Sequence, residues 1–328
     1  MNTEIFEYWR ASLLAIGAGL IVLGSLFHVE IAGAVAVWRN STAYNHCFLV
    51  IPIFGYLLWD RRETLREAVA VPFPAAALAG LPLAFAWLVA KRLGILEGRQ
   101  LVAMTFAQLL FLVVLGPRLW WRLAGPLLYL YFLVPFGEFL TPQLQNFTTA
   151  FVANGLPLLH IPAYITGYTI EIPEGTFLIA EACAGLRFLI AAIAFGCLYA
   201  LVMYRSPLRR ALFIGASMIV PIIANGFRAL GIVALGHFLG SARAVEADHV
   251  LYGWIFYSIV ILVLIALGLP FRQDRQPAEL QQPMSPFHAA PRRAMLFGTL
   301  AVVLLAATGP AIAATGVMVS AKAEENSG

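Results

Sequence analysis

The stretch that decides the fold runs from residue 181 to residue 204 and reads EACAGLRFLIAAIAFGCLYALVMY. No charged residue occurs between Arg187 and Arg205, and most side chains in that interval are apolar. About 20 such residues, wound as a helix, cross the hydrocarbon core of a bilayer. The stretch therefore predicts a membrane-spanning helix whose start carries three polar groups: the carboxyl of Glu181, the thiol of Cys183 and the guanidinium of Arg187.

The composition of the whole chain indicates a membrane protein rather than a soluble domain. Of its 328 residues, 61% are hydrophobic and 12% are charged, and the mean hydropathy is +0.84. A soluble core could not enclose that much apolar surface. The net charge of +4 comes from short basic clusters between apolar runs, which is the pattern of membrane topology. We therefore expect no nucleic-acid partner.

Nine apolar runs are long enough, or nearly so, to span a membrane. We expect an all-α polytopic integral membrane protein with about eight core transmembrane helices, one C-terminal helix and a small extracytoplasmic cap. The expected domains are a transmembrane domain at 1–275, a cytoplasmic linker at 276–293, and a C-terminal helix with a short tail at 294–328. The expected spans lie near residues 11–28, 47–59, 75–90, 101–116, 119–136, 184–204, 211–228, 250–270 and 294–314.

The distribution of Lys and Arg predicts which side of the membrane each loop faces. With the N-terminus in the cytoplasm, thirteen of the 21 Lys and Arg residues fall inside, as the positive-inside rule favours. Residues 136–182 then lie outside, and they contain an amphipathic piece at 143–159 and an alternating piece at 164–172 that predicts a short hairpin. We expect this segment to form the cap, with Cys183 facing away from the cytoplasm.

Further polar groups are expected near the same outer boundary. Arg228 follows Asn225 by three residues, and Asp248 precedes His249 at the start of the last core span. Ionisable groups at membrane depth indicate function. Pro221 and Asn225 also predict that the helix carrying Arg228 breaks near its outer end.

These residue types fit thiol-based acyl transfer. A thiol buried among apolar groups is inert, whereas a thiol beside Arg or His becomes a nucleophile. If residues 181–187 are helical, Cys183 and Arg187 share one face of that helix. We expect Cys183 to attack a peptide carbonyl, His249 to transfer the proton and Arg228 to hydrogen-bond the oxyanion.

Three blocks of sequence contain the candidate residues: EACAGLR at 181–187, ANGFR at 224–228, and His249 followed by Gly253-Trp254. Two further blocks are Tyr44–Tyr56 with Trp59–Arg62, and VPFGE at 134–138 running into PQLQ at 142–145. The first three resemble the signature blocks of the exosortases, specifically of the exosortase A type, and the other two resemble the accessory blocks of that family. The similarity covers roughly residues 40–272.

The resemblance implies a sortase-like membrane cysteine protease and transpeptidase of the bacterial inner membrane. It would cleave exported proteins that carry a C-terminal sorting signal, made of a Pro-Glu-Pro motif, a transmembrane helix and a basic tail. Its active site would face the periplasm, next to membrane lipid, and its work would be linked to exopolysaccharide production. The family's Cys, Arg and His fall on Cys183, Arg228 and His249.

Other positions have smaller expected roles. Ala184 stands where the family often has Ser, and Cys47 stands where a Gly usually follows the His. We interpret Cys47 and Cys197 as small hydrophobic residues, because neither has an ionic neighbour in the sequence. The residues expected to support the reaction are Glu181, Arg187, Asn225, His46 and Asp248.

Two other classes of protein remain open. A secondary transporter would gather ionisable groups near the membrane midplane and often show an internal repeat, and the sequence shows neither. A lipid-linked glycan transferase of exopolysaccharide assembly would use acidic residues, and Glu171, Glu174 and Glu181 are available. Replacement of Cys183 separates the protease from both.

The histidines lack metal-ligand spacing, so we expect no metal and no cofactor. The sequence leaves open the substrate proteins, the acceptor that resolves the thioester, and the oligomeric state.

Overall fold

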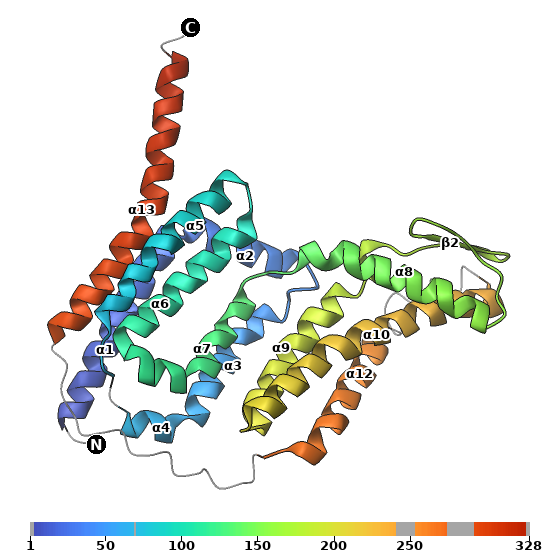
Figure 1. Ribbon diagram of the computed structural model, residues 1–328, viewed down its shortest axis with the longest axis horizontal. Helices are drawn as coiled ribbons and strands as arrows, with labels where there is room; N and C mark the ends of the chain where they lie inside the picture. Colours follow the sequence, from blue (N-terminus) through green and yellow to red (C-terminus); the bar gives the residue numbers. More distant parts are fainter. Residues whose placement is uncertain (1–2, 69, 241–252, 274–291, 326–328) are drawn as a thin grey trace. The chain divides into compact units, whose positions relative to one another are not determined.

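The computed structural model describes residues 3–68, 70–240, 253–273 and 292–325. Helices dominate it (Figure 1). The elements are α1 (Thr3–Leu26), α2 (His28–Asn40), α3 (Cys47–Asp60), α4 (Arg62–Glu67), the 3₁₀ helix η1 (Pro74–Ala79), α5 (Gly80–Arg92), α6 (Leu96–Arg122), α7 (Ala124–Tyr129), η2 (Leu130–Leu133), η3 (Glu138–Leu140), α8 (Thr141–Leu158), β1 (Tyr164–Thr166), β2 (Thr169–Ile172), β3 (Gly175–Leu178), η4 (Glu181–Cys183), α9 (Leu186–Met203), α10 (Pro207–Leu239), α12 (Gly253–Gly268), η6 (Leu269–Phe271) and α13 (Arg292–Glu325).

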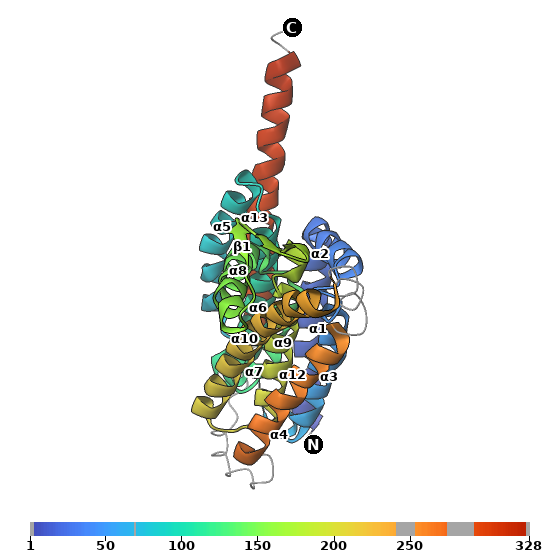
Figure 2. The same cartoon turned by 90° about the vertical axis from the view of Figure 1, so that its right-hand side faces the viewer.

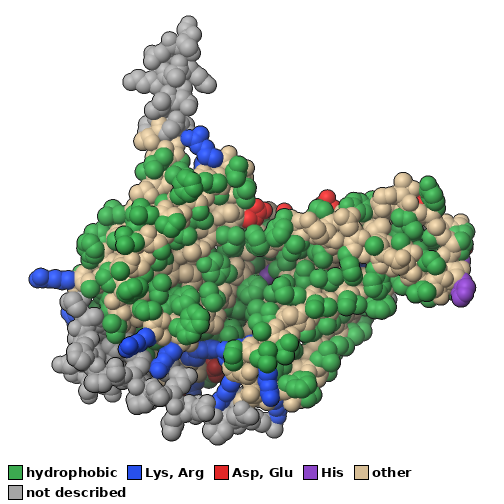
Figure 3. All heavy atoms as spheres, in the orientation of Figure 1, with side chains coloured by type: hydrophobic (Ala, Val, Ile, Leu, Met, Phe, Trp, Pro, Cys, Tyr) green, Lys and Arg blue, Asp and Glu red, His purple; other side chains and the backbone are tan. Residues whose placement is uncertain are grey.

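The protein is an all-α polytopic membrane protein, as the sequence predicts. Within the described ranges, six helical segments are long and apolar enough to cross a membrane, or seven if Ala124–Leu133 and Glu138–Leu158 form one span. Two shorter apolar helices, Cys47–Asp60 and Ile255–Phe271, lie where further spans are expected. Hydrophobic side chains cover most of the visible surface (Figure 3), which suits contact with lipid tails rather than water.

The number of spans differs from the nine expected at three places: the two shorter helices just named, and residues 119–136. This run is divided between the end of α6 and the short helices α7 and η2. The backbone of α6 itself is kinked at Gly116, which has φ 76° and ψ 164°. Pro117 has no N–H to donate to Val113, four residues earlier.

An extended segment that precedes η1 satisfies the carbonyl groups freed by this kink. The N–H of Phe73 donates to the carbonyl of Val113 at 2.8 Å, and the N–H of Val71 donates to that of Leu115 at 3.2 Å. A side chain at Gly116 would collide with the carbonyl oxygen of Val71. The chain therefore interrupts a long apolar helix without leaving these two acceptors unpaired.

The chain divides into two compact units, which we describe separately. Unit 1 contains the described residues of Met1–Ser41, Asn45–Phe136 and Ala278–Gly328, and unit 2 contains those of Thr42–Tyr44 and Gly137–Pro277. In unit 1, α13 packs against α1, α5 and α6 (Figures 1 and 2). Buried apolar side chains of α1, α5, α6 and α13 fill the space between these helices, including Leu110, Val113 and Val302.

In unit 2, α10 packs against α8, α9 and α12 (Figure 1). Two glycines allow α8 and α10 to approach each other closely. A Cβ on Gly226 of α10 would lie 2.7 Å from the ring of Phe151, and a Cβ on Gly155 of α8 would lie 2.6 Å from Leu230. The break expected near Pro221 and Asn225 is wrong, because α10 runs through both positions to Leu239.

Three short antiparallel strands in the order β1-β2-β3 follow α8. Tyr164 pairs with Glu171 in β1 and β2, which confirms the hairpin expected at 164–172. A third strand, Gly175–Leu178, pairs with β2 and was not expected. The piece at 143–159 that was expected to be amphipathic lies in the helix α8.

The sheet rests on α8 and α10 of the same unit. Ile170, Ile172 and Phe177 form a buried apolar cluster with residues of both helices, including Val152 and Val233. A hydrogen bond joins Nδ1 of His237, in the last turn of α10, to the Glu174 carboxylate between β2 and β3, at 2.8 Å. This packing fixes the sheet against the helix that carries Arg228.

Candidate active site

Cys183 ends a single 3₁₀ turn rather than opening a long helix. Its N–H donates to the carbonyl of Ala180 at 2.8 Å, and its side chain is partly exposed. Two residues later, Gly185 adopts φ +88°, and α9 begins only after it, at Leu186. Cys183 and Arg187 therefore do not lie on one helix, so the shared helical face considered from the sequence does not form.

Gly185 is required at this turn for two reasons. Its left-handed backbone conformation is one that residues with a Cβ adopt only at an energetic cost. A Cβ added there would also lie 2.6 Å from Cγ of Asn225. The turn after Cys183 can therefore rest directly on the Asn225 side chain.

Asn225 connects the Cys183 segment to two helices of unit 2. From α10, its Nδ2 donates to the backbone carbonyl of Cys183 at 3.0 Å and to Oγ1 of Thr148 on α8 at 3.2 Å. Asn225 is 3% exposed and Thr148 is 1% exposed. Hydrogen bonds shielded from water in this way hold their groups in one arrangement, so the backbone around the thiol is fixed from two sides.

Arg228 lies one helical turn after Asn225 and is 1% exposed. Its Nε donates to Oδ1 of Asn225 at 3.3 Å, as the i, i+3 spacing on one helix face permits. Its guanidinium carbon lies 5.5 Å from the centre of the Phe188 ring, near enough for a cation–π interaction. An ionisable residue buried in a membrane-spanning protein indicates a specific role.

The structure thus connects three of the residues predicted from the sequence: Cys183, Asn225 and Arg228. The contact to Cys183 is made through its backbone carbonyl. Arg187 lies near the same aromatic ring as Arg228, with its guanidinium carbon 4.8 Å from the centre of the Phe188 ring. Glu181 is exposed.

The remaining predicted residues belong to the other compact unit or lie outside the described residues. His249 and Asp248 fall in 241–252, outside the described part of the chain. His46 precedes α3 in unit 1, where its Nε2 lies 4.0 Å from Sγ of Cys47. Across the described residues, no group of three or more His, Cys, Asp or Glu is arranged to hold a metal ion.

Sequence reasoning missed Thr148. The signal was present, because Gln145, Thr148 and Thr149 stand at i, i+3 and i+4 and form one polar stripe on α8. All three side chains are buried, and Nε2 of Gln145 donates to the carbonyl of Ile179, just upstream of η4. A buried polar stripe on a helix of a membrane protein indicates a polar partner inside the protein.

The other two cysteines lie outside the network of Asn225. Cys47 is buried at the start of α3, and its Sγ donates to the carbonyl of Phe132 at 3.1 Å. Cys197 lies in the middle of α9. Neither residue is held by the network of Asn225.

Comparison with known proteins identifies the family of the chain. The family model described as transmembrane exosortase (Exosortase_EpsH) matches residues 38–266, which include Cys183, Asn225, Arg228 and His249. Neither the curated proteins nor the solved structures yield a match. Because the matched region covers well over half of the chain, the protein belongs to the transmembrane exosortases, a family of membrane-embedded cysteine proteases and transpeptidases.

Proposed function

We propose that this exosortase cleaves the C-terminal sorting signals of exported proteins, with Cys183 as nucleophile. The observation that carries the proposal is the network in which Asn225 joins the backbone of Cys183 to Arg228. It holds the backbone of a partly exposed cysteine and a buried arginine through the same side chain. Acyl transfer by a thiol benefits from a nucleophile and a positively charged donor that are both held in position.

The first half of the reaction forms a thioester. Sγ of Cys183 attacks the carbonyl carbon of the scissile peptide bond, the C–N bond breaks, and the departing amine takes up one proton. The negative charge on the carbonyl oxygen is held by N–H groups of Arg228. A guanidinium presents several donors in a plane, so its Nε bond to Asn225 is compatible with this second contact. A preorganised donor of this kind contributes about 3 kcal/mol.

The second half resolves the thioester. A water molecule or an amine attacks the thioester carbonyl, the S–C bond breaks, and the thiol is restored. Water as acceptor gives proteolysis, and an amine gives transpeptidation. In both halves a group that exchanges protons near neutral pH is needed, and we assign this role to His249, the histidine of the third signature block.

We propose that the substrates are exported proteins with a Pro-Glu-Pro motif, a transmembrane helix and a basic tail, and that the enzyme serves exopolysaccharide production. The site would face the periplasm from the bacterial inner membrane. The positive-inside distribution of Lys and Arg supports that orientation. A transporter or a glycan transferase would not depend on the Cys183 thiol.

The test is the mature C-terminus of a co-expressed substrate, measured by mass spectrometry. We expect truncation at the sorting signal with the wild-type chain and none with Cys183→Ala. Loss of cleavage in His249→Ala, with Cys183 still open to alkylation, would support the assigned proton transfer; full cleavage in that variant would remove His249 from the mechanism.

A further inference from the structure

A cavity of about 250 Å³ lies within unit 1, between α1, α2 and α6. Its lining is mostly apolar and includes Leu23, Phe27, Ile31 and Met104. An apolar cavity of about 150 Å³ in another protein stays dry and binds benzene. The present cavity is larger, so it has room for part of a hydrocarbon chain.

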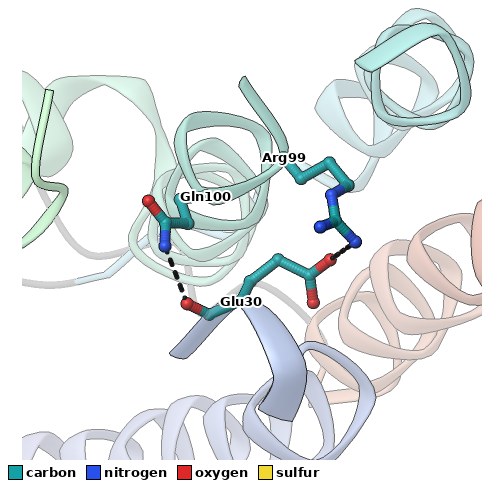
Figure 4. Close-up of polar contacts among 3 residues, drawn as sticks. All are labelled: Glu30, Arg99 and Gln100. Carbon is teal, nitrogen blue, oxygen red and sulfur yellow. Dashed lines mark hydrogen bonds and ion pairs between the residues drawn. The ribbon is translucent and has the colours of Figure 1, made fainter. Parts of the chain in front are cut away.

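Two of the residues that line the cavity are buried and polar. Glu30 on α2 is 3% exposed, and Gln100 on α6 is 4% exposed. Nη1 of Arg99 donates to the Glu30 carboxylate at 3.1 Å, and Nε2 of Gln100 donates to the Glu30 backbone carbonyl at 3.1 Å (Figure 4). The ion pair cancels the charge of the carboxylate, so this end of the cavity is polar without a net charge.

One buried polar atom at this end of the cavity accepts no hydrogen bond from the described residues. Oε1 of Gln100 is buried, and no described residue donates a hydrogen bond to it. Figure 4 shows this oxygen on the side of the amide that faces away from Glu30. A buried acceptor without a donor is destabilising, and a ligand with an N–H or O–H group would satisfy it.

We propose that this cavity binds the hydrocarbon chain of a membrane lipid whose head is a neutral hydroxyl, with the hydroxyl donating to Oε1 of Gln100. The apolar lining favours a hydrocarbon chain, and the unpaired Oε1 of Gln100 favours a head group that donates a hydrogen bond. Because Arg99 already neutralises Glu30, a charged head gains no ion pair. The lining helices belong to a membrane-spanning unit, so the bilayer supplies the occupant. This site does not depend on the chemistry proposed for Cys183.

The test uses the full chain in lipid nanodiscs with three photoactivatable probes of equal chain length: decanol, decyl methyl ether and decanoate, each with a diazirine near the chain end. Decanol should label α1, α2 and α6, and unlabelled decanol should displace it. The ether lacks the donor and should bind about three- to tenfold more weakly, the value of one net hydrogen bond. Decanoate should bind more weakly still, because it places a negative charge against an acceptor.

Two variants test whether the preference for decanol over the ether depends on Oε1 of Gln100. Gln100→Leu should bind decanol and the ether equally. Gln108→Leu is the matched control: Gln108 lies on the same helix, is equally buried, and donates from Nε2 to the carbonyl of Leu127 at 2.6 Å, but it does not line the cavity. This variant should keep the wild-type preference. The unfolding temperature of each variant shows that it is folded.

A variant whose added side chain occupies the cavity keeps the proposal testable if Gln100→Leu does not fold. A Cβ on Gly24 would lie 4.0 Å from Ile31 and meet nothing closer, and Gly24 lines the cavity. Gly24→Leu should therefore reduce labelling by every probe. Equal binding of decanol and ether to the wild type, loss of the preference in Gln108→Leu, or unchanged labelling in Gly24→Leu would each overturn the proposal.

Discussion

The side-chain amide of Asn225 donates a hydrogen bond to the backbone carbonyl of Cys183 at 3.0 Å, although the two residues are 42 positions apart. Through this bond α10 holds the 3₁₀ turn that carries the thiol. The same Asn225 accepts from Nε of Arg228 at 3.3 Å. One buried amide thus sets the position of the proposed nucleophile and of the proposed oxyanion donor.

Asn225→Ala should lower cleavage by about a hundredfold, because a displacement of about 1 Å in a reacting group costs that much. Membrane insertion should be unaffected. The measurement is the rate of substrate truncation, with expression level as reference. Asn154→Ala is the control, since Asn154 is exposed on α8 and bonds only to Ala150 of its own helix in the contacts described here. Equal rates in both variants would contradict the role of Asn225.

Thr148→Val should lower cleavage several-fold, because it removes the acceptor for the second N–H of Asn225 while keeping the shape of the side chain. Thr148→Ser keeps the hydroxyl and should restore most of the rate. Thr149→Val is a close control: its Oγ1 donates to Gln145 within α8 and makes no described contact with Asn225. A Thr148→Val enzyme as fast as the Thr149→Val enzyme would show that Thr148 only fills space.

Gly185→Ala should abolish most cleavage, because the added methyl would displace Asn225 and the backbone would be strained. Gly167→Ala is a control that separates backbone strain from the displacement of Asn225. Gly167 also has positive φ, at +59°, but a Cβ there meets nothing within 4 Å. The backbone strain should cost each variant about 1 kcal/mol of stability. Gly185→Ala should lose more than that because of its contact with Asn225, and only Gly185→Ala should stop cleavage. Thermal unfolding and substrate truncation are the two measurements, and an active Gly185→Ala enzyme would contradict the described geometry.

Arg228→Lys should lower cleavage by about a hundredfold or more, because lysine keeps the charge but lacks the planar set of donors. Arg187→Lys is the matched control, since its guanidinium faces the same Phe188 ring. It should lose far less. Single-turnover rates distinguish a loss of chemistry from a loss of substrate binding. Near-normal turnover in Arg228→Lys would reduce Arg228 to a structural anchor.

Much of the fold could be predicted from the sequence, because apolar runs must cross a bilayer as helices. The alternation at 164–172 likewise predicted a hairpin. The kink in α6 was harder to predict. Gly116 and Pro117 are visible in the sequence, but the donors that make the kink tolerable, Val71 and Phe73, come from a segment whose position only the structure shows.

The candidate site was predicted in part. Cys183 and Arg228 stand out as polar groups at the ends of apolar runs. The turn at Gly185 was missed because the helical pattern after it suggested a helix already formed at Cys183. Pro221 and Asn225 were expected to break α10 near its outer end. The amide of Asn225 instead bonds to Thr148 and Cys183, and the helix continues.

The central claim is that the thiol of Cys183 forms a thioester with the substrate. The most direct measurement is mass spectrometry of a co-expressed protein with a Pro-Glu-Pro sorting signal, with the wild-type chain, Cys183→Ala and Cys197→Ala. Cys197 lies on the adjoining helix α9 without contact to the Asn225 network. Truncation at the signal by wild type and Cys197→Ala, and an intact C-terminus with Cys183→Ala, is the predicted result. Truncation at the wild-type level with Cys183→Ala would contradict the account.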